Sequence, residues 1–209
     1  MAFPSVYEMT NPLTTVRKQH FWEYFSGATL NSRWTTNDYQ GTATFSMNDE
    51  VDGGFNITGG GASLNSSSIN FNDKRQYAHN GSVCIVTYRR QQAQNVNEVG
   101  MYNSRTGTAL NDSMMAREGD SFTYKSLFTR NASADTTTAS DVPIDTNWTN
   151  YKMETNGTNV RMWINGVLKV TTTSTMPTAK MQPVVLGLTA YNTSGTFDLS
   201  IKYMECYNT

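Results

Sequence analysis

The chain has 209 residues and a formal net charge of −1 at pH 7, with 16 basic and 17 acidic side chains. Its length suits one β domain of the sandwich or barrel type. The near balance of charge leaves no basic field to hold a phosphate backbone, which excludes nucleic acid as a partner. No apolar run approaches the length of a membrane-spanning helix, so no membrane partner is expected.

The composition favours strands joined by tight turns. Thr, Asn and Ser number 30, 21 and 18, a third of all residues. Such a mixture suits strands with hydroxyl-rich outer faces and disfavours helices, which are rich in Ala, Leu, Glu and Lys. The 11 Tyr, 9 Phe and 4 Trp residues argue against disorder, because disordered chains lack aromatic residues.

The first 20 residues contain Pro4 and Pro12 and show little periodicity, so we expect an extended arm or a first edge strand there. They lack the basic region and apolar core of a secretory signal. A hydroxyl-rich surface without an export signal fits a virion component that folds in the host cytoplasm. A mature fragment that has lost its signal is the alternative. Residues 21–209 form the predicted sandwich domain.

The remaining strands are predicted from alternating apolar residues and turn signals. They cover residues 42–47, 55–57, 68–72, 82–90, 97–103, 122–129, 184–191 and 196–207. Residues 59–68 are expected to be a loop, as are residues 131–141. The signal weakens over residues 104–121, where a helical turn and a loop are both open.

A meander is predicted over residues 148–173. Two Asn-Gly pairs, at Asn156 and Asn165, separate runs of β-favouring residues, and Asn-Gly is the preferred sequence of two-residue hairpin turns. The predicted strands are 148–155, 158–164 and 167–173. Since both faces of the meander carry apolar residues, it belongs inside a two-layer structure.

Roughly a dozen short strands without a convincing helix predict an all-β, antiparallel two-sheet sandwich. The two cysteines, Cys84 and Cys206, both fall in predicted strands, and buried free thiols are the expectation for them.

Four stretches of sequence resemble the concanavalin A-like lectin/glucanase jelly roll, including its laminin-G-like branch. They are FSGATLNSRW, DGGFNIT, the meander from NWTNYK to VTTT, and TFDLSIKYMECYN. Val160, Trp163, Ile164, Asn165 and Gly166 lie where the family has a strand ending in Asn/Asp-Gly. The layout also resembles laminin-G-like proteins of tailed phages, which serve as capsid decoration, fibre or adhesin modules. This resemblance covers residues 21–209 and implies a fold that hosts enzymes, lectins and structural modules alike.

Family-16 glucanases of this fold use a strand carrying Glu-x-Asp-x-x-Glu, whose alternation points two carboxylates into one cleft. The nearest match begins at Glu50 and Asp52, but Phe55 occupies the place of the second catalytic Glu. A retaining mechanism would then lack its proton donor. The motif therefore predicts that the chain is not an enzyme, and leaves a family-16-like glycoside hydrolase as the remote alternative.

Metal sites find little support in the residue spacing. His20 and His79 are too far apart in sequence to suggest a zinc site. Calcium is the one ion that the resemblance leaves open, since domains of this fold bind it through loop carboxylates. Its candidate ligands are Asp49, Glu50 and Asp52, and separately Asp112, Glu118 and Asp120. No other cofactor is expected.

Carbohydrate binding would use aromatic platforms with polar neighbours. The candidates are Trp34, Tyr39, Tyr88, Arg89, Tyr102 and Trp148. The leading hypothesis is a non-enzymatic virion surface protein, a capsid decoration or fibre-head module. It would bind capsid or other structural proteins and form a homo-oligomer on the particle. The alternative is a lectin-like adhesin for host glycans.

Overall fold

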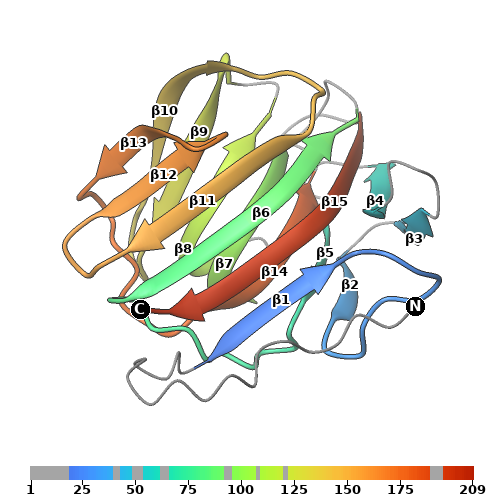
Figure 1. The fold of residues 1–209 in the computed structure, drawn as a ribbon, viewed down its shortest axis with the longest axis horizontal. Helices are drawn as coiled ribbons and strands as arrows, with labels where there is room; N and C mark the ends of the chain where they lie inside the picture. Colours follow the sequence, from blue (N-terminus) through green and yellow to red (C-terminus); the bar gives the residue numbers. More distant parts are fainter. Residues whose placement is uncertain are drawn as a thin grey trace.

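The structure is a computed structural model that describes residues 19–39, 43–48, 54–61, 66–91, 96–106, 109–119, 122–188 and 195–209. These residues contain fifteen β-strands and no helix, so no described segment is a helix that could cross a membrane. The strands form two antiparallel sheets that pack face to face (Figure 1). We call the sheet in front in this view sheet A and the sheet behind it sheet B. The predicted all-β, antiparallel two-sheet sandwich is confirmed.

Sheet A runs in the order β13-β12-β11-β6-β15-β4-β3, and β1 pairs with β15 beside this path. Its strands are β1 (His20–Tyr24), β3 (Thr44–Asn48), β4 (Gly54–Gly61), β6 (Ser82–Arg90), β11 (Thr149–Thr155), β12 (Val160–Ile164), β13 (Val167–Thr172) and β15 (Gly195–Asn208). Strand β15 lies in the middle of this sheet, pairing with β6 on one side and with β4 and β1 on the other.

Sheet B runs in the order β10-β9-β8-β7-β14-β5-β2. Its strands are β2 (Thr35–Tyr39), β5 (Ser66–Asn70), β7 (Val96–Thr106), β8 (Ala109–Glu118), β9 (Tyr124–Arg130), β10 (Asp135–Pro143) and β14 (Gln182–Leu188). Strand β7 is therefore the central strand of the seven, with β8 and β14 as its neighbours.

The predicted meander is present as β11, β12 and β13. At its second turn Asn165 and Gly166 have φ of 50° and 82°, the left-handed values that a two-residue hairpin turn requires. Ile164 pairs with Val167 across this turn, as predicted. The first turn differs, because Thr155 pairs with Val160 and residues 156–159 form a longer loop.

Side-chain hydrogen bonds explain the longer first loop. The carboxamide oxygen of Asn156 accepts from the backbone N–H groups of Thr158 and Asn159, both at 3.0 Å, and from the Thr158 hydroxyl at 2.8 Å. An Asn side chain that satisfies these groups locally stabilises a wider turn than the two-residue type.

Two segments predicted as loops, and residues 104–121, where a helical turn and a loop were both open, contain strands. Residues 109–118 and 135–143 form β8 and β10, and the predicted loop over 59–68 contains the end of β4 and the start of β5. Strand β10 is an edge strand rich in Thr, and its polar residues hid the alternation on which the prediction relied. The predicted arm lies outside the described residues as far as residue 18, and β1 begins at His20.

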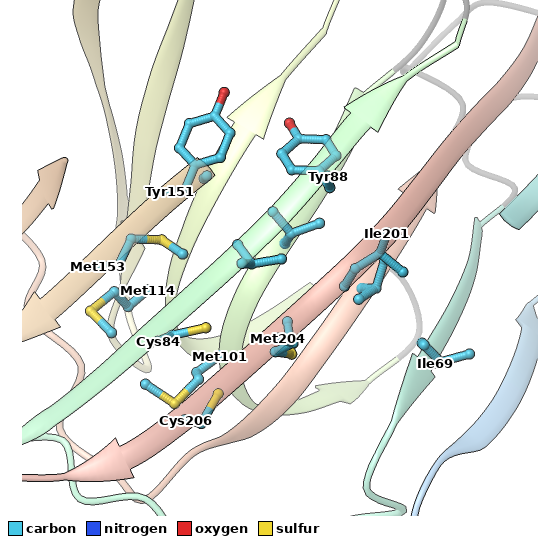
Figure 2. Packing of buried hydrophobic residues seen from close by; sticks show 14 of the residues in the cluster. Ile69, Cys84, Tyr88, Met101, Met114, Tyr151, Met153, Ile201, Met204 and Cys206 are labelled. Atoms are coloured by element: carbon cyan, nitrogen blue, oxygen red, sulfur yellow. The ribbon is translucent and has the colours of Figure 1, made fainter. Parts of the chain in front are cut away.

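The core lies between the sheets and is rich in methionine and aromatic side chains. Figure 2 shows Met101 and Met114 of sheet B packed toward Met153 and Met204 of sheet A. The ring of Phe197 fits between two glycines, since a Cβ at Gly59 or Gly187 would lie only 2.5 or 2.4 Å from it. Strands β4 and β14, which belong to opposite sheets, therefore both pack against this one aromatic ring.

Cys84 and Cys206 are free, buried thiols that lie opposite each other on β6 and β15. Burial, followed by the neighbouring Cys84 thiol, raises the pKa of Cys206 well above its usual range. Both side chains are part of the core cluster, so they act as small apolar side chains.

Candidate functional site on the outer face of sheet B

Three neighbouring strands in the middle of sheet B bring nine residues into a grid on its outer face. On β7 the side chains of Val99 and Met101 belong to the core, so the alternate positions 98, 100 and 102 face outward. Cross-strand pairing with β14 and β8 places these positions in three rows. The rows are Leu186, Glu98 and Arg117; Val184, Gly100 and Met115; Gln182, Tyr102 and Ser113. We call these nine residues the outer-face grid.

The first row carries an ion pair whose carboxylate is buried. The Arg117 Nε donates to Oε1 of Glu98 at 2.6 Å, and its terminal nitrogen pairs with the same oxygen. Arg117 is held in turn by the Thr137 hydroxyl at 3.0 Å and by the Phe128 ring, 3.6 Å beneath its guanidinium carbon. Glu98 is 0% exposed, and its Oε2 has no hydrogen-bond partner among the described residues. The carboxylate is thus oriented through Oε1 alone.

The third row also carries unpaired polar atoms. The Gln182 amide donates to Asp73 Oδ1 at 3.2 Å and to the Asn103 carbonyl at 3.3 Å, while its own oxygen accepts nothing from the described residues. The Ser113 hydroxyl is likewise buried without a described partner. Buried polar groups are normally hydrogen-bonded, so three unpaired groups on one face indicate a place where ligand or water completes the bonding.

The middle row is apolar and includes a glycine that the backbone requires. Val184 and Met115 flank Gly100, whose φ is +151°. A Cβ at Gly100 would lie 2.4 Å from the Met114 carbonyl oxygen and 2.9 Å from the Met115 Cα. Both obstacles are backbone atoms, so the strands themselves would have to move apart.

We therefore expect Gly100→Ala to lower the free energy of unfolding by about 2–3 kcal/mol. Urea denaturation of the variant measures this loss. Gly166→Ala is the matched control, because Gly166 also has a positive φ of 82° but nothing within 4 Å of a new Cβ. The control should lose only about 1 kcal/mol. Equal losses in the two variants would contradict the steric account.

The sequence-predicted carbohydrate residues do not form one site. Trp34 is in the core with the ring of Phe71 at 4.9 Å, and Tyr88 is buried against Tyr151. Tyr102 belongs to the outer-face grid of sheet B. Arg89 and Trp148 meet elsewhere, with the guanidinium carbon 4.7 Å from the indole ring.

Arg89 alternates with the core residue Tyr88 along β6, which puts the Arg89–Trp148 contact on the outer side of sheet A. The Lys202 ammonium lies 4.2 Å from the same indole ring. The side chain of Tyr39 lies outside the described residues.

Sequence reasoning missed Glu98, although the signal was present. Residues 97–103 were predicted as a strand with Val99 and Met101 on one face. The other face of the same strand holds Glu98 and Tyr102, and reading its alternate positions would have found them.

The candidate calcium ligands do not assemble within the described part of the chain. Asp49, Glu50, Asp52 and Asp120 lie outside it. Asp112 accepts hydrogen bonds from the backbone N–H and hydroxyl of Thr178, at 2.5 and 2.9 Å. Glu118 lies in the interior network described next. No group of three His, Cys, Asp or Glu side chains in the described residues is placed to hold a metal ion.

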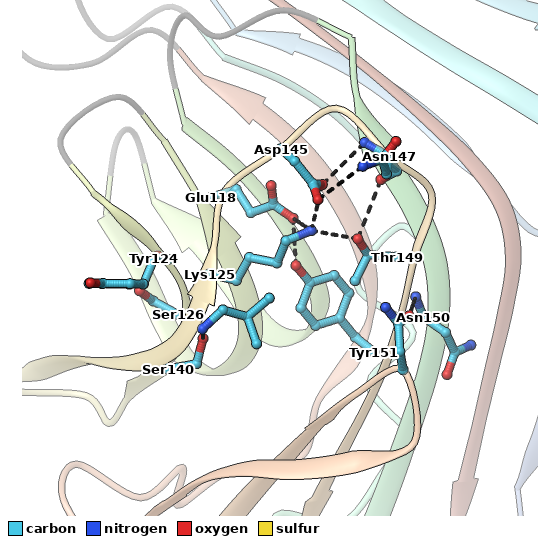
Figure 3. Close-up of polar contacts among 12 residues, drawn as sticks. Glu118, Tyr124, Lys125, Ser126, Ser140, Asp145, Asn147, Thr149, Asn150 and Tyr151 are labelled. Atoms are coloured by element: carbon cyan, nitrogen blue, oxygen red, sulfur yellow. Dashed lines mark hydrogen bonds and ion pairs between the residues drawn. The ribbon is translucent and has the colours of Figure 1, made fainter.

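A second polar cluster lies between the sheets. Figure 3 shows the Lys125 ammonium surrounded by Asp145 Oδ1 at 3.0 Å, the Thr149 hydroxyl at 2.5 Å and Glu118 Oε1 at 3.8 Å. The Tyr151 hydroxyl donates to the same Glu118 oxygen at 2.5 Å. Lys125, Glu118 and Tyr151 are all essentially unexposed. We call these five residues the interior network.

The interior network changes the acidity of its members. Burial, reinforced by the Glu118 charge, raises the pKa of Tyr151 well above its usual range. Partial burial raises the pKa of Asp145, but hydrogen bonds from Lys125 and Asn147 outweigh it and leave a net lowering. The interior network joins β8, β9 and β11 through the Lys125 ammonium and the Tyr151 hydroxyl, so we assign it a structural role, although Glu118 Oε2 has no partner among the described residues.

Comparison with known proteins supports a fold and not a sequence family. No family model matches the chain, and no curated protein matches it. A family-16 endo-glucanase from Bacteroides ovatus is similar in structure, with a TM-score of 0.63, 10% identity, and coverage of 89% of this chain and 99% of that one. A β-1,3-1,4-glucanase (lichenase) from a mouse hindgut metagenome has a TM-score of 0.61, 12% identity, and coverage of 90% and 98%.

A third similar structure is a carbohydrate recognition domain. That of Emp47p has a TM-score of 0.55, 9% identity, and coverage of 86% of this chain and 90% of that one. The fold is a concanavalin A-like jelly roll. Identities this low establish the jelly roll alone, so its use in this chain depends on the site.

The comparisons correct one prediction. The chain was predicted not to be an enzyme, because Phe55 replaces the second carboxylate of the glucanase motif. Glucanases among the similar structures share the jelly roll over almost their whole length, so that exclusion was wrong. The nearest match to the glucanase motif lies at residues 50–55, whereas the structure places a buried carboxylate on the central strand of sheet B, at Glu98.

Proposed function

We propose that this chain is a carbohydrate-active domain that binds a β-linked glucan across the outer-face grid of sheet B. The observation that carries the proposal is the set of unpaired buried polar atoms there, Glu98 Oε2, Gln182 Oε1 and the Ser113 hydroxyl. Two of the three are pure acceptors, and sugar hydroxyls are donors. The glucanases and the carbohydrate recognition domain among the similar structures support the ligand class.

The grid offers both kinds of contact that a sugar ring makes, hydrogen bonds to its hydroxyl groups and apolar contact with its C–H groups. Neighbouring strands lie about 4.8 Å apart and alternate residues about 6.8 Å apart, so the grid spans roughly 10 by 14 Å. Its end rows offer hydrogen-bonding groups, and its middle row, Val184, Gly100 and Met115, offers an apolar surface to the C–H groups of a ring. Val184, Met115 and Tyr102 are part of a buried apolar cluster, and Glu98 is 0% exposed, so the proposed binding requires this face to become accessible to the ligand.

Hydrolysis of the bound glucan is the second candidate, and Glu98 favours it. A glycosidase needs a carboxylate held in a fixed orientation with one oxygen free for the sugar, and Arg117 provides that orientation. A retaining enzyme also needs a second carboxyl group about 5–5.5 Å away. The grid has Tyr102 at the alternating position, so proton donation to the leaving oxygen would fall to a phenol hydroxyl.

The experiment is calorimetric titration with β-1,3-1,4-linked gluco-oligosaccharides, together with an assay for new reducing ends. We expect Glu98→Gln to weaken binding at least about tenfold, because a hydrogen bond to a charged group contributes about 1.5–3 kcal/mol. The same variant should abolish any release of reducing ends. Glu154→Gln is the control, since Glu154 alternates with core residues of β11 and faces outward from sheet A.

Ser113→Ala keeps the test decisive if Glu98→Gln does not fold. It removes a hydroxyl without a described partner, so it should weaken glucan binding while leaving stability unchanged. Failure of the wild-type protein to bind any β-glucan at millimolar concentration would contradict the proposal, as would unchanged affinity in both variants.

Localisation on a virus particle, capsid proteins as partners, host glycans as ligands and assembly into a homo-oligomer stay predictions from the sequence.

A further inference from the structure

An aromatic patch lies on the outer face of sheet A, on the other side of the sandwich from the grid. Strand β1 pairs with β15 so that His20 is opposite Tyr207, Trp22 opposite Glu205 and Tyr24 opposite Tyr203. The intervening residues Phe21, Met204 and Cys206 are core residues, so these six side chains face outward. We call the six residues the β1–β15 patch.

The rings of this patch are exposed to an unusual degree. Trp22 is 55% and Tyr24 60% exposed, the largest exposures of any aromatic residue among those with described side chains. Their ring centroids are 5.9 Å apart, and the Tyr24 ring is 4.8 Å from that of Tyr203. Large apolar side chains that lie together in water are a common feature of binding surfaces.

The polar groups of the patch are fixed among the rings. His20 Nε2 lies 2.8 Å from Glu205 Oε1, and the Tyr203 hydroxyl donates to Glu205 Oε2 at 2.8 Å. Both carboxylate oxygens therefore have partners, and the patch presents aromatic faces beside hydroxyl, imidazole and carboxylate groups. Because the rings sit on paired strands, little conformational entropy is lost when a ligand covers them.

This chemistry suits a neutral, polyhydroxylated ligand. A sugar chain offers C–H faces to the rings and hydroxyl groups to the polar atoms between them. A phosphate backbone would favour a basic cluster, which the patch lacks. We infer that the β1–β15 patch is a second glucan-binding surface, which holds the chain on insoluble polysaccharide. The ligand class rests on the proposed function of the grid.

Two surfaces on opposite faces predict different behaviour with soluble and insoluble ligands. The experiment measures depletion of the protein by insoluble β-glucan particles, in parallel with titration by soluble oligosaccharides. We expect Trp22→Ala and Tyr24→Ala each to lower the partition constant on particles at least tenfold. Trp22→Phe should retain most of the binding, and soluble titration at the grid should not change.

Leu168→Ala is the matched control. Leu168 is 48% exposed on β13, at the far edge of the same sheet, and its loss should leave retention on particles unchanged. Circular dichroism confirms that each variant is folded. Unchanged retention of Trp22→Ala and Tyr24→Ala, with retention lost in Glu98→Gln, would overturn the inference while the proposed function stands.

Two other results would also overturn the inference. If the wild-type protein binds neither soluble nor insoluble glucan, the proposed function is wrong, and so is the assignment of glucan as the ligand of the patch. If Trp22→Ala changes only the sedimentation coefficient and not retention, the patch is a contact between copies of this chain.

Discussion

Replacing Lys125 with Met is expected to lower the free energy of unfolding by about 3–5 kcal/mol, the cost of leaving a buried charge without its partner. Lys125 is 1% exposed, and its ammonium group is shared among Glu118, Asp145 and Thr149. Removing it leaves the Glu118 carboxylate, itself 1% exposed, beside a methionine. Urea denaturation at pH 7 should show a lower midpoint with an unchanged slope.

The double variant Glu118→Gln/Lys125→Met separates charge from packing. It removes both charges while the new amide still accepts from Tyr151, so it should recover a large part of the loss. Lys169→Met is the surface control, because Lys169 pairs with the exposed Asp141. Its denaturation midpoint should not move. A Lys125→Met protein as stable as the wild type would show that the interior network contributes nothing to stability.

The protein is expected to unfold in alkali, cooperatively, between about pH 10 and 12. Burial raises the pKa of Tyr77, Tyr88 and Tyr151 well above the ordinary value. Below about pH 10 the folded and unfolded chains both keep these protons, and the stability is complete. Above it the unfolded chain loses protons that the folded chain retains, so the free energy of unfolding falls by about 1.4 kcal/mol per pH unit for each tyrosine.

Absorbance at the tyrosinate band and circular dichroism, followed together, test this prediction. The part of the absorbance change that comes from the buried tyrosines should coincide with the circular dichroism transition, since buried tyrosines ionise only on unfolding. Tyr88→Phe keeps the ring that stacks 5.4 Å from Tyr151 and removes one titrating hydroxyl. Unfolding in alkali should then release one proton fewer, and the free energy of unfolding should fall less steeply with pH. Ionisation of these tyrosines in a protein that stays folded would contradict the expected shift.

Patterns set by local chemistry were predictable from the sequence. The turn at Asn165 and Gly166 needs positive φ at both positions, and few residue pairs supply it, so strands β12 and β13 and their register followed directly. The alternation in SVCIVTYRR likewise predicted β6. Polar strands escaped, because the Thr-rich β10 gains its structure from pairing with β9 and not from an apolar face.

The candidate site was hidden for a different reason. Its rows join residues 182–186, 98–102 and 113–117, and no spacing within the sequence says that β14 and β8 both flank β7. The glucanase motif has its carboxylates on one strand and so does not mark Glu98, whose fixed orientation comes from Arg117 on the neighbouring strand. The burial of Trp34 and Tyr88 could not be predicted from the sequence either, since an aromatic residue suits a core and a binding face equally well.

The position of β15 bears on how the protein is made in the cell. This strand supplies the hydrogen-bonding partners of β6, β4 and β1, and so joins segments that leave the ribosome much earlier. Until residues 195–208 emerge, those three strands expose unpaired edges, and the nascent chain depends on late, long-range pairing. Translation should therefore be complete through β15 before sheet A forms, which makes the unfinished chain a client for chaperones.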